Sequence, residues 1–333
     1  MNPQHTTRRD VLRWTAAAAA TTLNSTHVWA QGAWPARSIS IIAPNAPGGP
    51  ADTLARAVIN SMGQELGTSV VVDNKPGAAG KIGIQSMLRA PRDGHTIAIT
   101  SITAMSALPV FDAQVGYRSP EDFEPLSLAV RTPAVWCASP SLGVKTLAEL
   151  VALAKAKPNV LNYASFGTNS SSHLAQEDFF RRLDIHLTHV PFKGESEGVT
   201  ALLGNQVQVM LISGAAKPHI ESGKLVALAT TSESPWEVLP KVVTANRSGL
   251  VALNSYSYEP WLGFSAAAGV PQDVSARLQR AVRLALDKPE ARQTLARLGY
   301  RVAASSPQEM RDAIVQDMTL YRVLLRSGRV SVS

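Results

Sequence analysis

Short apolar runs alternate with segments of helical periodicity along most of this 333-residue chain. The apolar run at residues 38–43 is followed by a segment with helical spacing that Gly67 ends, and the pattern then repeats from the run at 70–72. Such alternation is typical of parallel strands joined by crossover helices. We therefore expect an α/β fold that begins with three parallel strands, the third at residues 96–100, and two crossover helices.

A second unit with the same alternation begins near Pro133. After Trp261 one apolar run is followed by mostly helical sequence, which suits a chain that returns to complete its first part. We expect an open, mostly parallel sheet with flanking helices in each of two lobes, joined by crossing strands. The predicted divisions are 31–131 (first part of lobe 1), 132–257 (lobe 2) and 258–333 (return to lobe 1). Within the second unit and the return, strands are expected at 134–139, 161–164, 187–190, 207–212, 225–230 and 261–266, and helices at 147–157, 173–183, 273–286, 290–298 and 307–325.

The first thirty residues have the features of a secretory signal peptide. Arginines precede a short alanine-rich apolar run, and small residues precede a predicted cleavage after Ala30. Arg8 and Arg9 lie in a segment that resembles the twin-arginine export motif. The apolar run is too short to span a bilayer, which takes roughly 20 residues. We expect an exported, periplasmic protein that uses the twin-arginine route.

Composition excludes several classes of protein. The hydrophobic fraction of 45% supports a sizeable core, and the net charge of +7 is spread without a basic stripe. This pattern argues against nucleic-acid binding. The single cysteine, Cys137, cannot form an intramolecular disulfide, and no clustered Cys and His residues suggest a metal site. We expect no metal and no cofactor.

Two loops carry the main candidates for ligand binding. Each follows a predicted strand and begins a helix, at the sheet edge where ligands of open α/β sheets bind. Helix N-termini present unpaired N–H groups and partial positive charge, which favour anions. The first loop is glycine-rich, and in it Asp52 is as well suited to capping the helix as to binding a ligand. The second loop is rich in hydroxyls. The candidates are Asn45, Ala46, Pro47, Gly48, Gly49 and Asp52 in the first loop, and Ser165, Phe166, Thr168, Asn169, Ser170 and Ser171 in the second.

Motifs for phosphate or dinucleotide binding are not matched. The glycine turn at 48–49 lacks the Lys and hydroxyl of a phosphate-binding loop. Ser171 and His173 are two residues apart, so on a helix they point in different directions. We expect a protein that is not an enzyme, with a hydrolase as the less favoured alternative.

The motifs taken together resemble the Bug-type periplasmic solute receptors of tripartite tricarboxylate transporters. The resemblance covers nearly all of the chain after the signal. It is carried, in order, by Ala-Pro-Gly-Gly at 46–49, Val-Val-Val-Asp-Asn-Lys-Pro-Gly-Ala at 70–78, Asp-Gly-His-Thr at 93–96, Leu-Asn-Tyr-Ala-Ser at 161–165, Ser-Ser-His-Leu-Ala at 171–175 and His-Val-Pro-Phe-Lys-Gly at 189–194.

The resemblance implies a two-lobed binding protein that closes on a small carboxylate, held by amides, hydroxyls and bridging waters. It adds Ser101 and Thr103 as a third loop, and Ser213 and Gly214 as a fourth. The implied partners are membrane transporter subunits or, alternatively, a sensor kinase, and the receptor is expected to be a monomer.

Three positions depart from the family pattern. The family usually has an aromatic residue where Asn45 stands, a small residue where Phe166 stands, and Asp-Asn near Ile212 and Ser213. We therefore expect a less acidic binding site, and a ligand whose second end differs from an amino-dicarboxylate and is aromatic or apolar. The identity of the carboxylate does not follow from the sequence.

Overall fold

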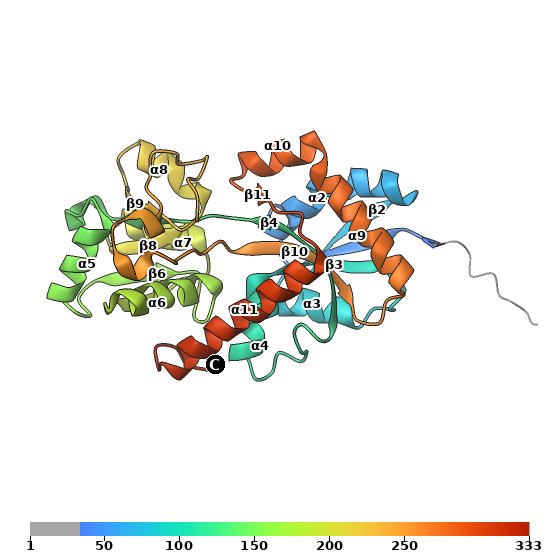
Figure 1. Ribbon diagram of the computed structural model, residues 1–333, viewed down its shortest axis with the longest axis horizontal. Helices are drawn as coiled ribbons and strands as arrows, with labels where there is room; N and C mark the ends of the chain where they lie inside the picture. The colour runs from blue at the N-terminus through green and yellow to red at the C-terminus, as the bar shows by residue number, and fades with distance from the viewer. Residues whose placement is uncertain (1–33, 333) are drawn as a thin grey trace, which may run out of the picture. The chain divides into compact units, whose positions relative to one another are not determined.

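The structure is a computed structural model that describes residues 34–332, and the described residues from Arg37 onward belong to one compact unit. The predicted signal peptide at 1–30 lies outside the described residues. Two sheets with flanking helices make up the fold, as predicted (Figure 1). The division at residues 131 and 257 stays a prediction, because the compact unit contains both sheets.

The first sheet has six strands in the order β11-β4-β10-β3-β1-β2. Its centre is the predicted parallel set, in which Ile41 of β1 pairs with Val72 of β2 and with Ile97 of β3. The prediction of three parallel strands is thereby confirmed. The strands are β1 (Ile39–Ala43), β2 (Val70–Asn74), β3 (Thr96–Ser101), β4 (Phe123–Arg131), β10 (Trp261–Ala267) and β11 (Arg301–Val302).

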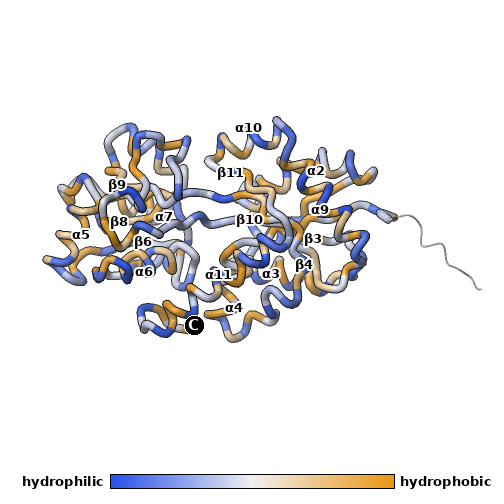
Figure 2. The backbone as a smooth tube through the Cα atoms, in the orientation of Figure 1, coloured by the Kyte–Doolittle hydropathy of each residue, from blue (hydrophilic) through white to orange (hydrophobic). Residues whose placement is uncertain are grey.

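The helices around the first sheet bury one face each. In α2 (Pro50–Leu66) the proline occupies the first turn, where a missing N–H costs nothing, and Gly67 ends the helix at φ 68°. Figure 2 shows apolar and polar residues alternating along α9 (Gln272–Asp287) and α11 (Pro307–Arg326), consistent with amphipathic helices. The remaining helices of this lobe are α3 (Lys81–Leu88), α4 (Leu108–Phe111) and α10 (Pro289–Arg297), with 3₁₀ segment Ala78–Gly80 and π-helical segment Thr103–Ala107.

The second sheet has five strands in the order β7-β6-β8-β5-β9. Tyr163 of β6 pairs in parallel with His189 of β7 and Val209 of β8, so these three strands end at the same edge. The strands are β5 (Val135–Ala138), β6 (Asn162–Ser165), β7 (Thr188–Pro191), β8 (Val209–Ile212) and β9 (Val226–Thr230). The helices are α5 (Leu147–Ala156), α6 (Ser171–Leu183), α7 (Glu195–Leu203) and α8 (Lys217–Glu221), and the short 3₁₀ turns are Pro140–Leu142, Gly214–Ala216, Ala245–Arg247 and Val251–Leu253.

Both sheets are mixed, which refines the expectation of mostly parallel sheets. β10 lies antiparallel between β3 and β4, and β5 lies antiparallel between β8 and β9. The reason is that the chain passes between the two sheets and comes back. It leaves the first sheet along β4 and returns along β10, so β10 runs opposite to β3 and β4. It enters the second sheet along β5, which runs opposite to its neighbours β8 and β9.

Each lobe has its own buried core, and one core reaches across. Trp136 packs against Phe179 and Phe180 inside the second lobe, with ring centroids 4.2 and 5.5 Å apart. The core under α11 also includes Leu174 of α6 and Val330 near the C-terminus. The C-terminal segment therefore joins the two lobes through apolar contacts. No helix among residues 34–332 is both long enough and apolar enough to cross a membrane.

Candidate functional site

The glycine-rich turn between β1 and α2 is built from backbone hydrogen bonds. The Gly49 N–H donates to the Ala46 carbonyl at 3.0 Å. Gly48 has φ +79°, which favours glycine, and a Cβ there would meet nothing within 4 Å. At Gly49, in contrast, a Cβ would lie 2.9 Å from the Asn45 Cβ, so a larger residue would collide. The turn thus places Gly48 beside open space at the start of a helix.

Asp52 holds this turn together from inside. Its carboxylate accepts hydrogen bonds from the Gly48 N–H at 2.9 Å, the Arg56 Nε at 2.8 Å and the Asn74 side chain at 3.0 Å. The bond from Arg56 is the main reason that the pKa of Asp52 falls to about 2. With 2% of its surface exposed, Asp52 acts within the loop, which favours the capping interpretation over direct ligand contact.

The third loop lies close to the first. Ser101 ends β3, and its hydroxyl accepts a hydrogen bond from the Ala104 N–H at 3.2 Å, at the start of the π-helical segment. A Cβ at Gly80 would lie 3.4 Å from Pro44 and 4.0 Å from Ala104. The ends of β1 and β3 therefore meet at one edge of the first sheet, with Thr103 half-buried beside them.

The serine-rich loop follows β6 and begins α6. Ser170 is the N-cap, and its hydroxyl accepts a hydrogen bond from the His173 N–H at 3.2 Å. Asn169 has φ +58°, and its N–H donates to His173 Nδ1 at 3.1 Å. Ser165 is fully buried, with its hydroxyl 2.6 Å from His189 Nε2. Burial raises the pKa of Tyr258, in the connection between lobes, and the Ser171 side chain opposes that rise.

Two histidines lie behind this loop: His189 contacts the Ser165 hydroxyl, and His173 contacts the Asn169 main chain. The rings of His173 and His189 stack with centroids 3.9 Å apart and an interplanar angle of 13°. Burial lowers the pKa of His173 to about 3 and that of His189 to about 4, so both are neutral at neutral pH. His173 Nδ1 accepts a hydrogen bond from the Asn169 N–H. This ring nitrogen is therefore bonded to the main chain and not to the Ser171 hydroxyl.

The fourth loop contains a residue that the sequence reasoning missed. Glu195 is the first residue of α7, and its Oε1 accepts hydrogen bonds from the Ser213 N–H at 3.0 Å and the Ser213 hydroxyl at 2.7 Å. Burial raises the pKa of Glu195, and the two bonds from Ser213 oppose that rise. A carboxylate therefore lies beside Ser213 in this loop.

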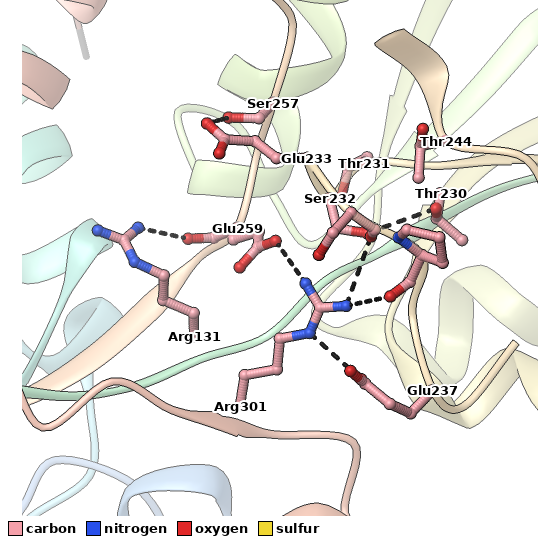
Figure 3. Close-up of polar contacts among 12 residues, drawn as sticks. Arg131, Thr230, Thr231, Ser232, Glu233, Glu237, Thr244, Ser257, Glu259 and Arg301 are labelled. Atoms are coloured by element: carbon pink, nitrogen blue, oxygen red, sulfur yellow. Dashed lines mark hydrogen bonds and ion pairs between the residues drawn. The ribbon is translucent and has the colours of Figure 1, made fainter. Parts of the chain in front are cut away.

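The fourth loop also touches the first lobe. A Cβ at Gly299, in the turn before β11, would lie 3.2 Å from Trp236 and 3.9 Å from the Gly214 Cα. Two residues later, Arg301 donates to the Pro235 carbonyl at 2.6 Å and pairs with Glu259 at 3.1 Å. Figure 3 shows the Arg301 guanidinium joined to Glu259 and to Glu237. The segment 298–301 is thus fixed against the second lobe.

Exposure divides the sixteen predicted residues into two groups. Asp52, Ser165 and Asn169 are buried and hydrogen-bonded inside the fold. The accessible or half-buried members are Asn45, Ala46, Pro47, Gly48, Gly49, Ser101, Thr103, Phe166, Thr168, Ser170, Ser171, Ser213 and Gly214. No described group of three or more His, Cys, Asp or Glu side chains is placed to hold a metal ion.

Two cavities lie near the connections between elements. One of about 620 Å³ adjoins the glycine-rich turn and is lined by Pro47, Gly48, Arg56 and residues of α10. A larger one of about 820 Å³ lies between α6, α11 and the connection at 255–259, and none of the sixteen predicted residues lines it. The larger cavity is therefore separate from the four loops.

These features define a two-lobed α/β solute-binding fold with loops and helix N-termini at the sheet edges. The family model for the tripartite tricarboxylate transporter family receptor matches residues 54–326, and the chain belongs to this family. BugT of Bordetella pertussis is 30% identical over 295 residues, which cover 88% of this chain and 90% of BugT.

Solved structures agree with this assignment. The structure of R. palustris Rpa4515 with adipate has a TM-score of 0.77 at 26% identity, covering 90% of this chain and 99% of that one. The structure of MatC from Rhodopseudomonas palustris with bound malate has a TM-score of 0.73 at 28% identity, covering 88% and 100%. The predicted resemblance to Bug-type receptors is confirmed.

Proposed function

We propose that this protein is an exported receptor that captures a small carboxylate between its two lobes and presents it to the membrane subunits of a tripartite tricarboxylate-type transporter. The observation that carries the proposal is the placement of two long helices, α2 and α6. Each follows a parallel strand through a short loop, one in each lobe. Their N-termini supply oriented N–H groups and partial positive charge for an anion.

The surroundings of both N-termini support a carboxylate held by dipoles. The loops at 45–49 and 165–171 contain no Arg or Lys. Amides, hydroxyls and bridging waters can hold an anion without a fixed ion pair, and they release it more readily than a buried ion pair does. Related receptors have been seen with adipate and with malate, which is consistent with a carboxylate ligand here.

The ligand is best sought with thermal-shift measurements on the mature chain against mono- and dicarboxylates. A true ligand at 100 times its dissociation constant should stabilise the protein by roughly 2.7 kcal/mol. Titration calorimetry on each hit then gives the affinity. If no carboxylate stabilises the protein at millimolar concentration, the proposal is wrong.

The export route and the partner are part of the same proposal. Replacing Arg8 and Arg9 together by lysine should retain the protein in the cytoplasm if it uses the twin-arginine route. Pull-down of the candidate transporter subunits should depend on the ligand found in the screen. Pull-down of a sensor kinase instead would assign the receptor to signalling.

The hydrolase alternative makes a separate prediction. An enzyme that used Ser171 and His173 would turn over a carboxylic ester, and His173→Ala would abolish that rate. His173 accepts a hydrogen bond from a backbone N–H and stacks on His189. We therefore expect that neither the wild type nor the His173→Ala variant turns over a carboxylic ester.

A further inference from the structure

Glu195 occupies a position suited to choosing among carboxylate ligands. It lies after β7 at the edge where β6, β7 and β8 end together, and this edge also carries the serine-rich loop. Its Oε1 is bonded twice to Ser213. Within residues 34–332 no hydrogen bond reaches its Oε2, and Glu195 is half-buried, so part of it is in contact with solvent.

The first lobe approaches Glu195 from the other side. Gly214, next to Ser213, faces the Leu298 carbonyl, from which a Cβ at Gly214 would be 3.8 Å away. Two residues beyond Leu298 is Tyr300, whose pKa is raised to about 12 by burial and by the charge of Glu195. The fourth loop, which Glu195 holds through Ser213, is thus packed against the first lobe at Leu298.

We propose that Glu195 is a specificity-determining residue, which binds a hydrogen-bond donor at the far end of the ligand and so selects amino- or hydroxycarboxylates over plain dicarboxylates. This inference rests on the proposed function. An ionised carboxylate has only acceptors, so Oε2 needs a donor. A second ligand carboxylate would bring a like charge into a partly desolvated site, which costs free energy.

The chain offers a matched control on the same helix. Glu197 is exposed, and its Oε2 accepts a hydrogen bond from the Lys193 N–H at 3.2 Å. Glu197→Gln therefore removes one negative charge two residues from Glu195 without changing the contact with Ser213. Glu195→Gln keeps an oxygen that can accept from Ser213 but removes the charge. Glu195→Asp keeps the charge.

The experiment uses two pairs of probes that differ only at the far end, adipate with 6-aminohexanoate and glutarate with 5-aminopentanoate. Calorimetry on the wild type should give a preference of about 10-fold or more for the amine of each pair, the size expected for a hydrogen bond to a charged group. Glu195→Gln should reduce that preference about 10-fold. Glu197→Gln should leave it unchanged, and Glu195→Asp should retain it.

The outcomes separate the two proposals. If the wild type binds a dicarboxylate as tightly as its amino partner, or if Glu195→Gln discriminates as the wild type does, the role of Glu195 is refuted while carboxylate capture stands. If no probe and no carboxylate of the wider screen binds the wild type, the proposed function fails and this inference fails with it. Equal circular dichroism spectra of all variants show that the comparison is between folded proteins.

Discussion

The Asn169 side chain donates a hydrogen bond to the Ser331 carbonyl at 2.9 Å, although 162 residues separate the two. This bond ties the serine-rich loop to the end of the chain. Arg329 adds a second tie, since it reaches the Ile185 carbonyl at 3.2 Å and the Glu177 carboxylate at 3.6 Å. The tail after α11 therefore supports the loop that we propose as one half of the carboxylate site.

Removing the tail should destabilise the protein and weaken ligand binding. Truncation after Gly328 removes the buried Val330, 7% exposed, and leaves the buried Glu177 without its cation. We expect the free energy of unfolding to fall by about 2–4 kcal/mol, measured by urea denaturation. Truncation after Ser331 is the control, because it keeps all of these contacts. Equal stability of the two truncated proteins would contradict the role of the tail.

Arg301 should control how readily the lobes stay together. It bonds to the Pro235 carbonyl, Glu237 and Glu259 from a strand of the first sheet. Arg301→Ala should favour the separated arrangement, so the dissociation constant of the ligand rises about 10-fold. Arg297→Ala on α10 is the control, since that exposed side chain donates to the Thr294 hydroxyl at 3.4 Å, within its own helix. Small-angle scattering should show a larger radius of gyration for the Arg301 variant alone.

Asp317 should make stability depend on pH. Burial raises its pKa from 3.8 to about 6, although the Trp261 indole N–H, 2.9 Å away, and Arg131 oppose the rise. The folded protein thus binds this proton more tightly than the unfolded chain does, and the cost of the ionised carboxylate is complete above pH 6 and disappears towards pH 4.

Asp317→Asn removes that cost and keeps an oxygen to accept from Trp261. The variant should be more stable than the wild type at pH 8, and the difference should shrink as the pH falls from 6 to 4. Asp312→Asn, at an exposed position of the same helix, should show no such trend. Thermal unfolding across this pH range measures the effect, and parallel curves for the wild type and Asp317→Asn would refute it.

Gly48 and Gly143 form a matched pair for testing the first loop. Both have positive φ, +79° and +76°, and a Cβ at either position would meet nothing within 4 Å. Substitution by valine should cost each protein about 1–3 kcal/mol of stability through backbone strain. Only Gly48→Val should also weaken carboxylate binding, by about 10-fold or more, because its side chain would stand beside the proposed anion site. Unchanged affinity would show that the loop does not hold the ligand.

The helices and strands could be predicted well where the hydrophobic pattern was uninterrupted and ended at a clear turn residue. The turn before Pro50 was identifiable because glycines follow a buried strand and precede a helical pattern. β4 was not predicted, since Pro125 interrupts its pattern and strands rarely contain proline. α7 was also missed, because Gly198 weakens its helical propensity. In the structure a Cβ at Gly198 would lie 2.6 Å from the terminal methyl of Met210, so a larger residue would require that side chain to move.

The candidate site residues could be predicted from the sequence only where they are contiguous in the chain. The hydroxyl-rich loop at 165–171 is visible as a run in the sequence. Glu195 is not, because an acidic residue at a helix start is common for electrostatic reasons alone. Its partner Ser213 is 18 residues away, and the contacts of Gly299 and Ser331 with the second lobe span longer distances still. Such pairings depend on the tertiary structure, which no local pattern specifies.

The position of β10 in the first sheet bears on the order in which the chain can fold as it is synthesised. β10 lies between β3 and β4, and β11 is added at the edge next to β4, so the first sheet is complete only after residue 302 has left the ribosome. The second sheet uses one continuous stretch, from Val135 to Thr230. The later part of the sequence can therefore finish its sheet first, and the N-terminal strands wait for a neighbour from the far end of the chain.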